Sequence, residues 1–445
     1  MPKRTISWNT SKWVPLFFTI WTGQTLSWVG SAVAQFGLVW WVTEKTGSAT
    51  VLAVATLLSM LPGVVLGPLV GALIDRWNRR IVMLVADGII ALISLWLAYL
   101  FWVGSMQIWH LYVVMVVRAI GGTFHWPANQ ASISLMVPKE HLPRIGGLNQ
   151  TIGGAVNIIS PPVGALLLQI MPLHWIMMID VITAVFSVLP LLFIIIPQPD
   201  KAPAVASTVS AISSIWEDIK EGFRYIWNWS GLFWLLILVM LINFFVNPAM
   251  SLVPILVTRH FQGGALELGW LNASWGVGML IGGLLLGVWG GFRKRTYTML
   301  IGTLGLGIGI LMVAFAPAYM LPLAIAGFFL GSAMNAMTNG SGFALLQTIV
   351  EPEIQGRVFT VVMSMAGAIS PLSLAVGGPI ADWLGVRTLY FIAGAALILL
   401  SVIGTMSPVI LNLEQEANAK KTGQKAPATI DHDSSPQNGG DVSSS

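Results

Sequence analysis

The chain has 445 residues, of which 56% are hydrophobic and 9% are charged, whereas about 25% of the residues in an ordinary soluble domain are charged. This composition excludes a string of soluble domains and indicates a membrane protein with many spans. The net charge of +4 does not indicate nucleic-acid binding, because the basic residues are spread over short segments between apolar runs. The chain has no cysteine, which excludes disulfides, thiolate metal sites and cysteine nucleophiles.

Twelve apolar runs follow one another, each long enough to cross the ~30 Å hydrocarbon core of a bilayer as a helix. The runs of the first half are Trp13–Trp41, Ala49–Ile74, Ile81–Val103, Trp109–Val137, Ile145–Ile170 and Trp175–Ile196. Those of the second half are Leu232–Val257, Leu268–Val288, Thr296–Ala316, Leu321–Ile349, Val358–Trp383 and Leu389–Val409. The first run is longer than the apolar core of a signal peptide, which predicts a retained first span.

Basic residues between the runs predict the orientation of the spans. With the amino terminus inside, the short inner segments hold twelve of them, namely Lys3, Arg4, Lys12, Arg76, Arg79, Arg80, Lys139, Arg144, Arg293, Lys294, Arg295 and Arg357. The outer loops hold three, which are Lys45, Arg259 and Arg387. Because cytoplasmic loops carry an excess of Lys and Arg, both ends of the chain are predicted to be cytoplasmic.

Two further segments lie outside the runs. Residues 197–230 begin with a Pro- and Ala-rich stretch and then place apolar residues at helical spacing opposite charged ones. This pattern predicts a cytoplasmic linker with an amphipathic helix on the membrane surface. Residues 413–445 are rich in Lys, Ser and Gly and predict a disordered cytoplasmic tail. The rest divides into an N-terminal six-helix half, 1–196, and a C-terminal six-helix half, 231–412.

Internal repetition indicates that the two halves arose by duplication. At one constant offset, Val137, Glu140, Arg144 and Gly164 fall on Val350, Glu353, Arg357 and Gly377. Two parallel halves related by an axis along the membrane normal are an arrangement found in transporters, with the substrate path at the interface between the halves.

The loop between the second and third runs carries a dense charged motif. Its residues are Gly71, Asp75, Arg76, Asn78, Arg79 and Arg80. The motif resembles the signature of the major facilitator superfamily, with Asn78 in place of a turn glycine because asparagine also tolerates left-handed backbone. The resemblance implies a conformational switch, in which a charge clasp holds one conformation and releases in the other. The alternative is that these residues only orient the insertion of the helices.

A second stretch of the sequence resembles one branch of this superfamily in particular. Val117–Ala128, which contains Arg118 and His125, is followed by Val137–Glu140, and together they look like the macrolide-efflux branch of the drug:proton antiporters. Bacterial siderophore exporters are also similar. The likeness covers most of residues 13–409 and is strongest in the first half.

Ionisable residues within the spans are the candidates for proton coupling, because each is costly in a bilayer unless it is paired or hydrated. They are Asp87 in the third run and Arg118 and His125 in the fourth. The resemblance associates the arginine matched by Arg118 with proton movement, and Asp87 beside Arg118 or His125 can titrate as substrate comes and goes. The alternative is a permanent structural pair between the third and fourth spans. Asp180 in the sixth run is predicted to make a structural polar contact with the fourth or fifth span.

The fifth run holds a candidate gate, formed by Gly154, Ser160, Pro161 and Gly164. These residues are similar to the antiporter motif of glycine and proline in this span. Small residues permit tight packing and proline frees a carbonyl group, so the helix can bend here. The alternative is that the segment serves helix packing alone.

Polar and aromatic residues within the spans are the candidates for lining a substrate cavity. They are Gln24, Trp28, Gln35, Asn243, Asn247, Asn272, Asn335 and Asn339. An apolar cavity with scattered amides and rings suits a large lipophilic ligand, although each amide alternatively makes a hydrogen bond between helices. The chain has no phosphate-binding Gly-Lys-Ser/Thr loop and no histidine pair at ligand spacing in a span, so we expect no enzyme activity, no cofactor and no metal site.

These patterns predict an all-α membrane protein of the bacterial inner membrane, with twelve transmembrane helices in two pseudo-symmetric six-helix halves. The expected activity is export of lipophilic, macrolide-like drugs by proton antiport. The expected partners of the monomer are the small substrate, protons and the lipid bilayer, without nucleic acid. An exporter of siderophores or metabolites is the alternative within this fold, and a non-transporting membrane sensor or lipid-moving protein is the alternative from another class.

Overall fold

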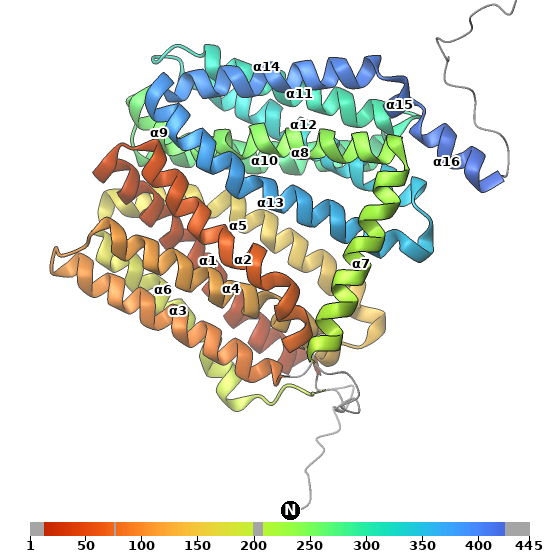
Figure 1. The fold of residues 1–445 in the computed structure, drawn as a ribbon. Coiled ribbons are helices and arrows are strands. Elements are labelled where there is room, and N and C mark those ends of the chain that lie inside the picture. Colours follow the sequence, from red (N-terminus) through yellow and green to blue (C-terminus); the bar gives the residue numbers. More distant parts are fainter. Residues whose placement is uncertain (1–12, 75–76, 199–207, 423–445) are drawn as a thin grey trace, which may run out of the picture.

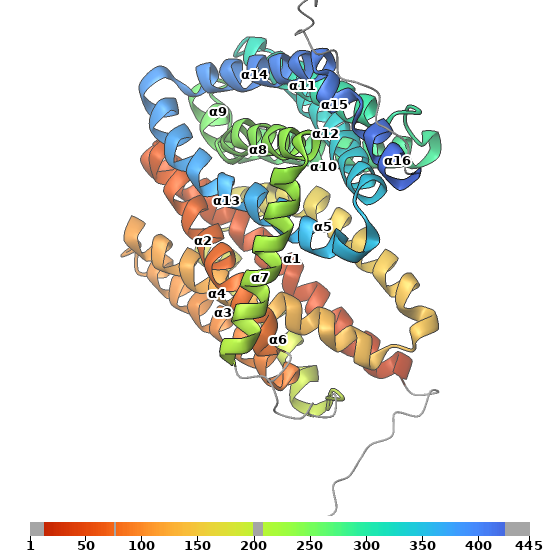
Figure 2. The same cartoon turned by 45° about the vertical axis from the view of Figure 1, so that its right-hand side comes forward.

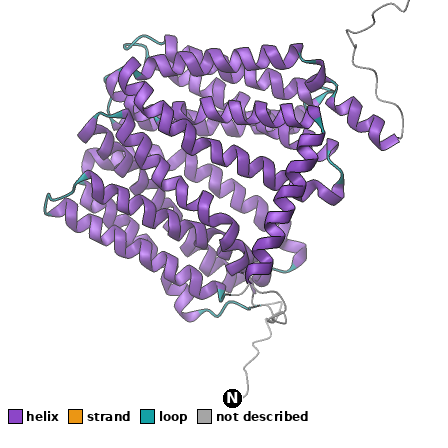
Figure 3. Ribbon diagram, in the orientation of Figure 1, coloured by secondary structure: helices purple, strands orange, loops and turns teal. Residues whose placement is uncertain are grey.

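The computed structural model describes residues 13–74, 77–198 and 208–422, and nearly all of them lie in helices, with no strand in these ranges (Figure 3). Twelve long helices form two bundles that lie side by side (Figures 1 and 2). The first bundle holds α1 (Trp13–Thr46), α2 (Ala49–Ile74), α3 (Arg79–Trp102), α4 (Ile108–Met136), α5 (Leu142–Ile170) and α6 (Leu173–Phe193). The second holds α8 (Ser230–Ser251), α10 (Ala265–Trp289), α11 (Arg295–Phe315), α12 (Leu321–Ile349), α13 (Pro352–Leu384) and α14 (Val386–Met406). The predicted all-α fold is confirmed.

Among the described residues, ten of the long helices are apolar enough over their length to cross a membrane. The other two, α1 and α4, are as long but carry polar residues such as Gln24 and Arg118. A span can carry such residues where protein or a wetted cavity, and not lipid, surrounds them. These two spans hold five of the candidate site residues, namely Gln24, Trp28, Gln35, Arg118 and His125.

A separate helix, α7 (Thr208–Asn228), runs across both bundles (Figures 1 and 2) and occupies the place of the predicted linker helix. It contacts α2 of the first bundle and α8 and α13 of the second. The end of the bundles where α1 begins and α7 lies is called the terminal end below. The opposite end, where α1 ends and α2 begins, is called the far end. Short helices η1 (Lys139–His141), α9 (Val253–Arg259) and α15 (Pro408–Leu411) complete the connections.

The start of the predicted disordered tail is helical, which corrects that prediction for residues 413–422. They form α16 (Leu413–Thr422). Leu413 is fully buried, and Trp229 donates a hydrogen bond from its indole nitrogen to Glu416 at 3.2 Å. The backbone nitrogen of Arg295 donates to Glu414 at 3.1 Å. Residues 413–422 are mostly polar, so their composition does not indicate a packed helix. One buried leucine and two carboxylates nevertheless attach it to the second bundle. Residues 423–445 lie outside the described residues.

Asn78 begins α3 in a way that differs from the sequence expectation. Its backbone is extended, with φ of −70°, and is not left-handed. Its side chain accepts hydrogen bonds from the backbone nitrogens of Arg80 at 3.1 Å and Ile81 at 3.4 Å. Asparagine acts here as an N-cap, which satisfies backbone donors that have no partner within the helix.

Glycines bring α11 and α12 into direct backbone contact. A Cβ atom at Gly309 of α11 would lie 2.6 Å from the backbone nitrogen of Gly331 and 2.7 Å from the carbonyl oxygen of Gly327 in α12. Backbone atoms cannot rotate out of the way as a side chain can. A side chain at position 309 would therefore push the two helices apart.

Gly309→Ala is accordingly expected to lower the stability of the purified protein by about 2 kcal/mol, the usual cost of overpacking. The matched control is Gly283→Ala in α10, where a Cβ would meet nothing within 4 Å. Alanine stabilises a helix over glycine by up to ~1 kcal/mol, so the control is expected to gain stability. Thermal unfolding in detergent measures both variants, and a shift of the same sign in the two would contradict the packing argument.

Candidate functional site

The first charged group of the site lies between α1, α3, α4 and α6. The buried carboxylate of Asp87 on α3 lies 3.1 Å from Nε2 of His125 on α4. Its second oxygen accepts hydrogen bonds from the Gln24 amide of α1 at 3.0 Å and from the Ser187 hydroxyl of α6 at 2.9 Å. Four helices of the first bundle thus converge on one carboxylate.

A second charged group lies deeper in the same bundle. Asp180 of α6 is 1% exposed, and one of its oxygens lies 2.6 Å from the guanidinium of Arg118 on α4. Ser94 of α3 donates to the same oxygen and Ser31 of α1 to the other, both at 2.7 Å. Arg118 also donates to Ser94 at 2.9 Å. This carboxylate is therefore held by donors from three helices.

The two groups differ in what they can do chemically. Arginine stays charged at any physiological pH, so Arg118 and Asp180 form a lasting ion pair. Histidine is the side chain whose ordinary charge change falls nearest neutral pH, so the Asp87–His125 pair is of the chemical type that a proton-coupled site uses. The sequence offered Arg118 and His125 as partners for Asp87. In the structure His125 contacts Asp87, whereas Arg118 pairs with Asp180. Asp180 reaches the fourth span through Arg118, and it also contacts the first and third spans.

A cavity of about 280 Å³ opens beside the Asp87–His125 pair. Gln24 and Trp28 of α1 line it together with Asn149 of α5. The Trp28 ring is 40% exposed, so an aromatic face is available next to the titratable pair. The pair consequently lies on the wall of a mostly apolar cavity and is not sealed within the bundle.

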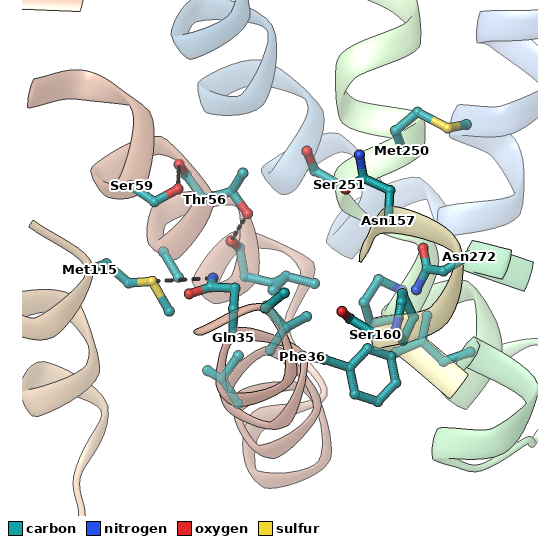
Figure 4. A pocket seen from close by; sticks show the side chains of 18 of the residues that line it. Gln35, Phe36, Thr56, Ser59, Met115, Asn157, Ser160, Met250, Ser251 and Asn272 are labelled. Atoms are coloured by element: carbon teal, nitrogen blue, oxygen red, sulfur yellow. Dashed lines mark hydrogen bonds between the residues drawn. The ribbon is translucent and has the colours of Figure 1, made fainter. Parts of the chain in front are cut away.

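A larger cavity of about 370 Å³ lies between the two bundles. Figure 4 shows Gln35, Phe36 and Ser160 of the first bundle facing Met250 and Asn272 of the second. Most of the lining is apolar. The Gln35 amide nitrogen lies 3.5 Å from the sulfur of Met115, a weak acceptor. Within the described residues, the buried Ser160 hydroxyl has no hydrogen-bond partner. The cavity thus offers three amides, from Gln35, Asn157 and Asn272, and four hydroxyl-bearing residues in mostly apolar surroundings.

The remaining cavity candidates lie elsewhere in the second bundle. Asn243 and Asn339 line a small cavity of about 50 Å³. Asn339 donates to the Asn335 side chain at 3.0 Å, and Asn247 donates to Ser370 at 2.7 Å. The eight residues of the sequence prediction are therefore divided. Gln35 and Asn272 line the central cavity, Gln24 and Trp28 line the cavity beside Asp87, and the other four lie apart from both.

Three of the four gate residues lie where α5 meets its neighbours. Ser160 lines the central cavity. A Cβ at Gly164 would lie 2.9 Å from the Phe36 ring of α1, and a Cβ at Gly269 of α10 would lie 3.3 Å from the carbonyl oxygen of Pro161. Gly154 has no atom within 4 Å of the place of a Cβ. The segment 160–164 is thus a close contact between the bundles, and Gly154 is separate from it.

The bundles also meet through α2 and α13 at the far end. The carboxylate of Asp382, in the last turn of α13, accepts hydrogen bonds from the Ser48 hydroxyl at 2.9 Å and from the backbone nitrogens of Ala49 at 2.9 Å and Thr50 at 2.8 Å. It also lies 3.2 Å from the guanidinium of Arg259. This set of five residues is called the far-end clasp below. Because the carboxylate sits at the N-terminus of α2, the helix dipole strengthens the contact.

Sequence reasoning missed Asp382. One signal was available, because an acid in the last turn of a helix is unfavourable beside the negative end of that helix's dipole. An acid in such a position needs partners from another segment. Here those partners come from the other bundle, which makes Asp382 a link between the two halves.

The predicted conformational-switch motif is described only in part. Gly71 lies in α2, whereas Asp75 and Arg76 lie outside the described residues. The guanidinium of Arg79 donates to the Ala131 carbonyl oxygen of α4 at 3.2 Å. Arg80 donates to the carbonyl oxygens of Leu191 and, at 2.7 Å, Leu192 in α6. Both arginines thus bind carbonyl groups near the C-terminal ends of α4 and α6, where helix dipoles favour cations.

In the part of the chain that the structure describes, no cluster of three or more His, Cys, Asp or Glu side chains could hold a metal ion. The arrangement that the structure does provide is a titratable pair, two cavities and a closed contact between bundles.

Comparison with known proteins identifies the family of the chain. Residues 10–439 match the family described as transmembrane secretion effector. The chain is 32% identical over 412 residues to macrolide efflux protein A of Streptococcus pyogenes, covering 91% of this chain and 98% of that protein. It is 25% identical to the multidrug efflux pump Tap of Mycolicibacterium fortuitum, covering 90% and 97% of the two chains.

Solved structures share the fold. A bacterial homologue of the iron transporter ferroportin in an inward-facing state superposes with a TM-score of 0.70 at 16% identity, covering 90% of this chain and 99% of that one. A D-xylose-proton symporter superposes with a TM-score of 0.64 at 15% identity, covering 89% and 97%. At these identities the likeness concerns the fold. The chain belongs to the transmembrane secretion effector family of the major facilitator superfamily.

Proposed function

We propose that this protein exports lipophilic drugs from the bacterial cell in exchange for protons, and that the Asp87–His125 pair carries the proton. The observation that supports this most is the titratable pair on the wall of a cavity, 3.1 Å between its two side chains. Relatives named as a macrolide efflux protein and as a multidrug efflux pump support export as the direction. No catalytic step is part of the proposal.

The orientation is proposed from the basic residues. The segments between spans at the terminal end carry most of them, so this end is assigned to the cytoplasm and the far end to the outside of the inner membrane. The far-end clasp and the contact of α5 with α10 then close the protein toward the outside. On this assignment the structure represents a conformation that receives cargo from the cytoplasmic side.

Competition between drug and proton supplies the coupling. When the far end is closed, a drug that enters the cavities displaces the proton from the Asp87–His125 pair, and the proton leaves to the cytoplasm. When the far end is open, the drug departs and the pair takes up a proton from outside. Drug and proton exclude each other from the site. Movement of a drug molecule in one direction therefore requires movement of a proton in the other.

The cavities favour an uncharged or weakly basic lipophilic cargo. The central cavity is mostly apolar, with Gln35, Ser160 and Asn272 among its polar groups. A site with few polar groups selects by shape and apolar area more than by a fixed pattern of hydrogen bonds. Macrolides are the first class to test, since they combine a large apolar ring with scattered hydroxyl groups. Both charged groups and the central cavity are built from one chain, so we propose the monomer as the transporting unit.

Two assays test the proposal. The first is expression in a pump-deficient bacterium that is challenged with macrolides, dyes and siderophore precursors, where raised resistance to the macrolides is expected. The second uses everted vesicles that contain the protein and have an acidic interior. Addition of the drug is expected to release protons from the vesicles.

The results separate the alternatives. Protection against siderophore precursors alone would favour a metabolite exporter of the same fold. If the protein in liposomes moves no solute under a pH gradient of either direction, the transport proposal is wrong and a sensor or lipid-moving role takes its place.

A further inference from the structure

A groove of about 580 Å³ lies between the linker helix α7 and the span α13, apart from the two cavities of the transport site. Ile219, Phe223 and Trp227 of α7 form one wall, and Val361 and Met365 of α13 form the other. The three α7 residues recur every four positions and so lie in one row along the helix. Phe223 is 39% exposed and Trp227 62% exposed, so protein leaves much of this apolar row uncovered.

A basic row lies beside the apolar row on the same helix. Lys220 and Arg224 also line the groove, one helical turn apart, and both are exposed. The neighbouring acid, Glu221, lies 2.6 Å from Arg357 of α13, which compensates its charge. Glu217, the other acid of α7 with a described side chain, does not line the groove. The groove therefore combines apolar walls with two cations.

The position of the groove along the membrane normal follows from the length of α13. Its 33 residues make a helix about 50 Å long, which exceeds a hydrocarbon core of ~30 Å by about 10 Å at each end. Val361 and Met365 lie about 14 to 20 Å from the start of the helix. They thus lie about 4 to 10 Å inside the edge of the hydrocarbon, at the level of the first part of the phospholipid chains and below the phosphate groups.

We propose that the groove between α7 and α13 binds one anionic phospholipid. The phosphate group lies against Lys220 and Arg224, and one acyl chain lies along the row of Ile219, Phe223 and Trp227. A zwitterionic lipid meets the apolar walls equally well, but its own cation opposes the two basic side chains. Because α7 also contacts α2, the lipid steadies a helix that spans both bundles.

Native mass spectrometry of the full-length protein tests the proposal without any transport assay. The protein is mixed with equal amounts of phosphatidylglycerol and phosphatidylcholine that have identical chains. Retention of phosphatidylglycerol is expected to be roughly tenfold higher, given the attraction of each basic group for an anionic headgroup. The double variant Lys220→Gln/Arg224→Gln is expected to lose this preference. Glycerol phosphate, which has the headgroup charge but no chains, is expected not to compete.

A matched control removes two cations elsewhere at the terminal end. Lys139→Gln/Arg144→Gln changes the net charge equally, and neither residue lines the groove, so the preference should persist. Ser364→Trp fills the groove without changing charge and is expected to lower retention of phosphatidylglycerol, which keeps a test available if the double variant does not fold. Equal retention of the two lipids by the wild type would overturn the proposal. So would an unchanged preference in the double variant, unchanged retention in Ser364→Trp, or competition by glycerol phosphate.

Discussion

Asp87→Asn is expected to abolish drug-driven proton release in everted vesicles while leaving the folded protein intact. Asparagine retains an oxygen that accepts from Gln24 and Ser187, which donate to the carboxylate at 3.0 Å and 2.9 Å. Histidine, unlike arginine, has a neutral form near physiological pH, so the substitution need not leave a buried charge without a partner. The loss of stability is therefore expected to stay within about 1 kcal/mol, whereas the site can no longer exchange a proton for drug.

Drug binding at a series of pH values gives the sharper readout. In the wild type, drug and proton compete, so affinity is expected to rise as the pH rises and the pair loses its proton. In Asp87→Asn the affinity is expected to vary much less over the same range. A variant that still releases protons when drug is added would show that the pair has only a structural role.

Asp180→Asn is the matched control, because it removes a carboxylate from the same bundle with a different expected outcome. Arg118 lies 2.6 Å from Asp180 and cannot lose its charge. Removing one member of a buried ion pair costs ~3–5 kcal/mol, so the yield of folded protein is expected to fall sharply. The two variants thus separate a loss of coupling from a loss of fold.

Asp382→Ala is expected to open the far end of the protein. The substitution removes the carboxylate that joins α13 to Ser48 and to the first backbone nitrogens of α2. Charge-assisted hydrogen bonds are about twice as strong as neutral ones, so losing this set is expected to shift the balance of conformations by about tenfold or more toward the state open at the far end.

The shift is measurable as a distance between spin labels. The chain has no cysteine, so Lys45→Cys and Leu384→Cys provide two specific labels at exposed positions of the far end. Pulsed electron resonance should show a larger share of long distances in the Asp382→Ala background. Glu267→Ala is the control, because Glu267 also binds a backbone nitrogen at this end, that of Gly264 at 2.7 Å, but within its own helix. An unchanged distance distribution in the Asp382 variant would refute the role of the clasp.

Much of the fold could be predicted from the sequence because the bilayer imposes a strong rule. A run of apolar residues that is long enough to cross the membrane has to be a helix, since every backbone group must be satisfied inside lipid. The same rule makes ionisable residues within a span conspicuous, and this is why Asp87, Arg118 and His125 could be singled out. Their exact partners depended on which helices are neighbours.

The partner of Arg118 could not be read from the chain. The sequence predicts a contact of Asp180 with the fourth or fifth span, but it does not single out Arg118, which lies 62 positions away. Spans that are apolar on all sides also show little of which face meets protein. For this reason the cavity candidates were chosen by residue type, and Asn335 and Asn339 proved to bond to each other. Asp382 escaped notice because it stands at the edge of a span, where a charge costs much less than it does inside the bilayer.

The path of α7 across both bundles limits the size of the cargo that the proposed transport cycle can accept. With 21 residues, this helix is a stiff rod about 31 Å long, and it touches α2 on one side and α8 and α13 on the other. A rod fixed at two points limits how far those points can move apart. In the proposed transport cycle, compounds too bulky to pass between those points are expected to be rejected by size alone, however well the cavity walls suit them.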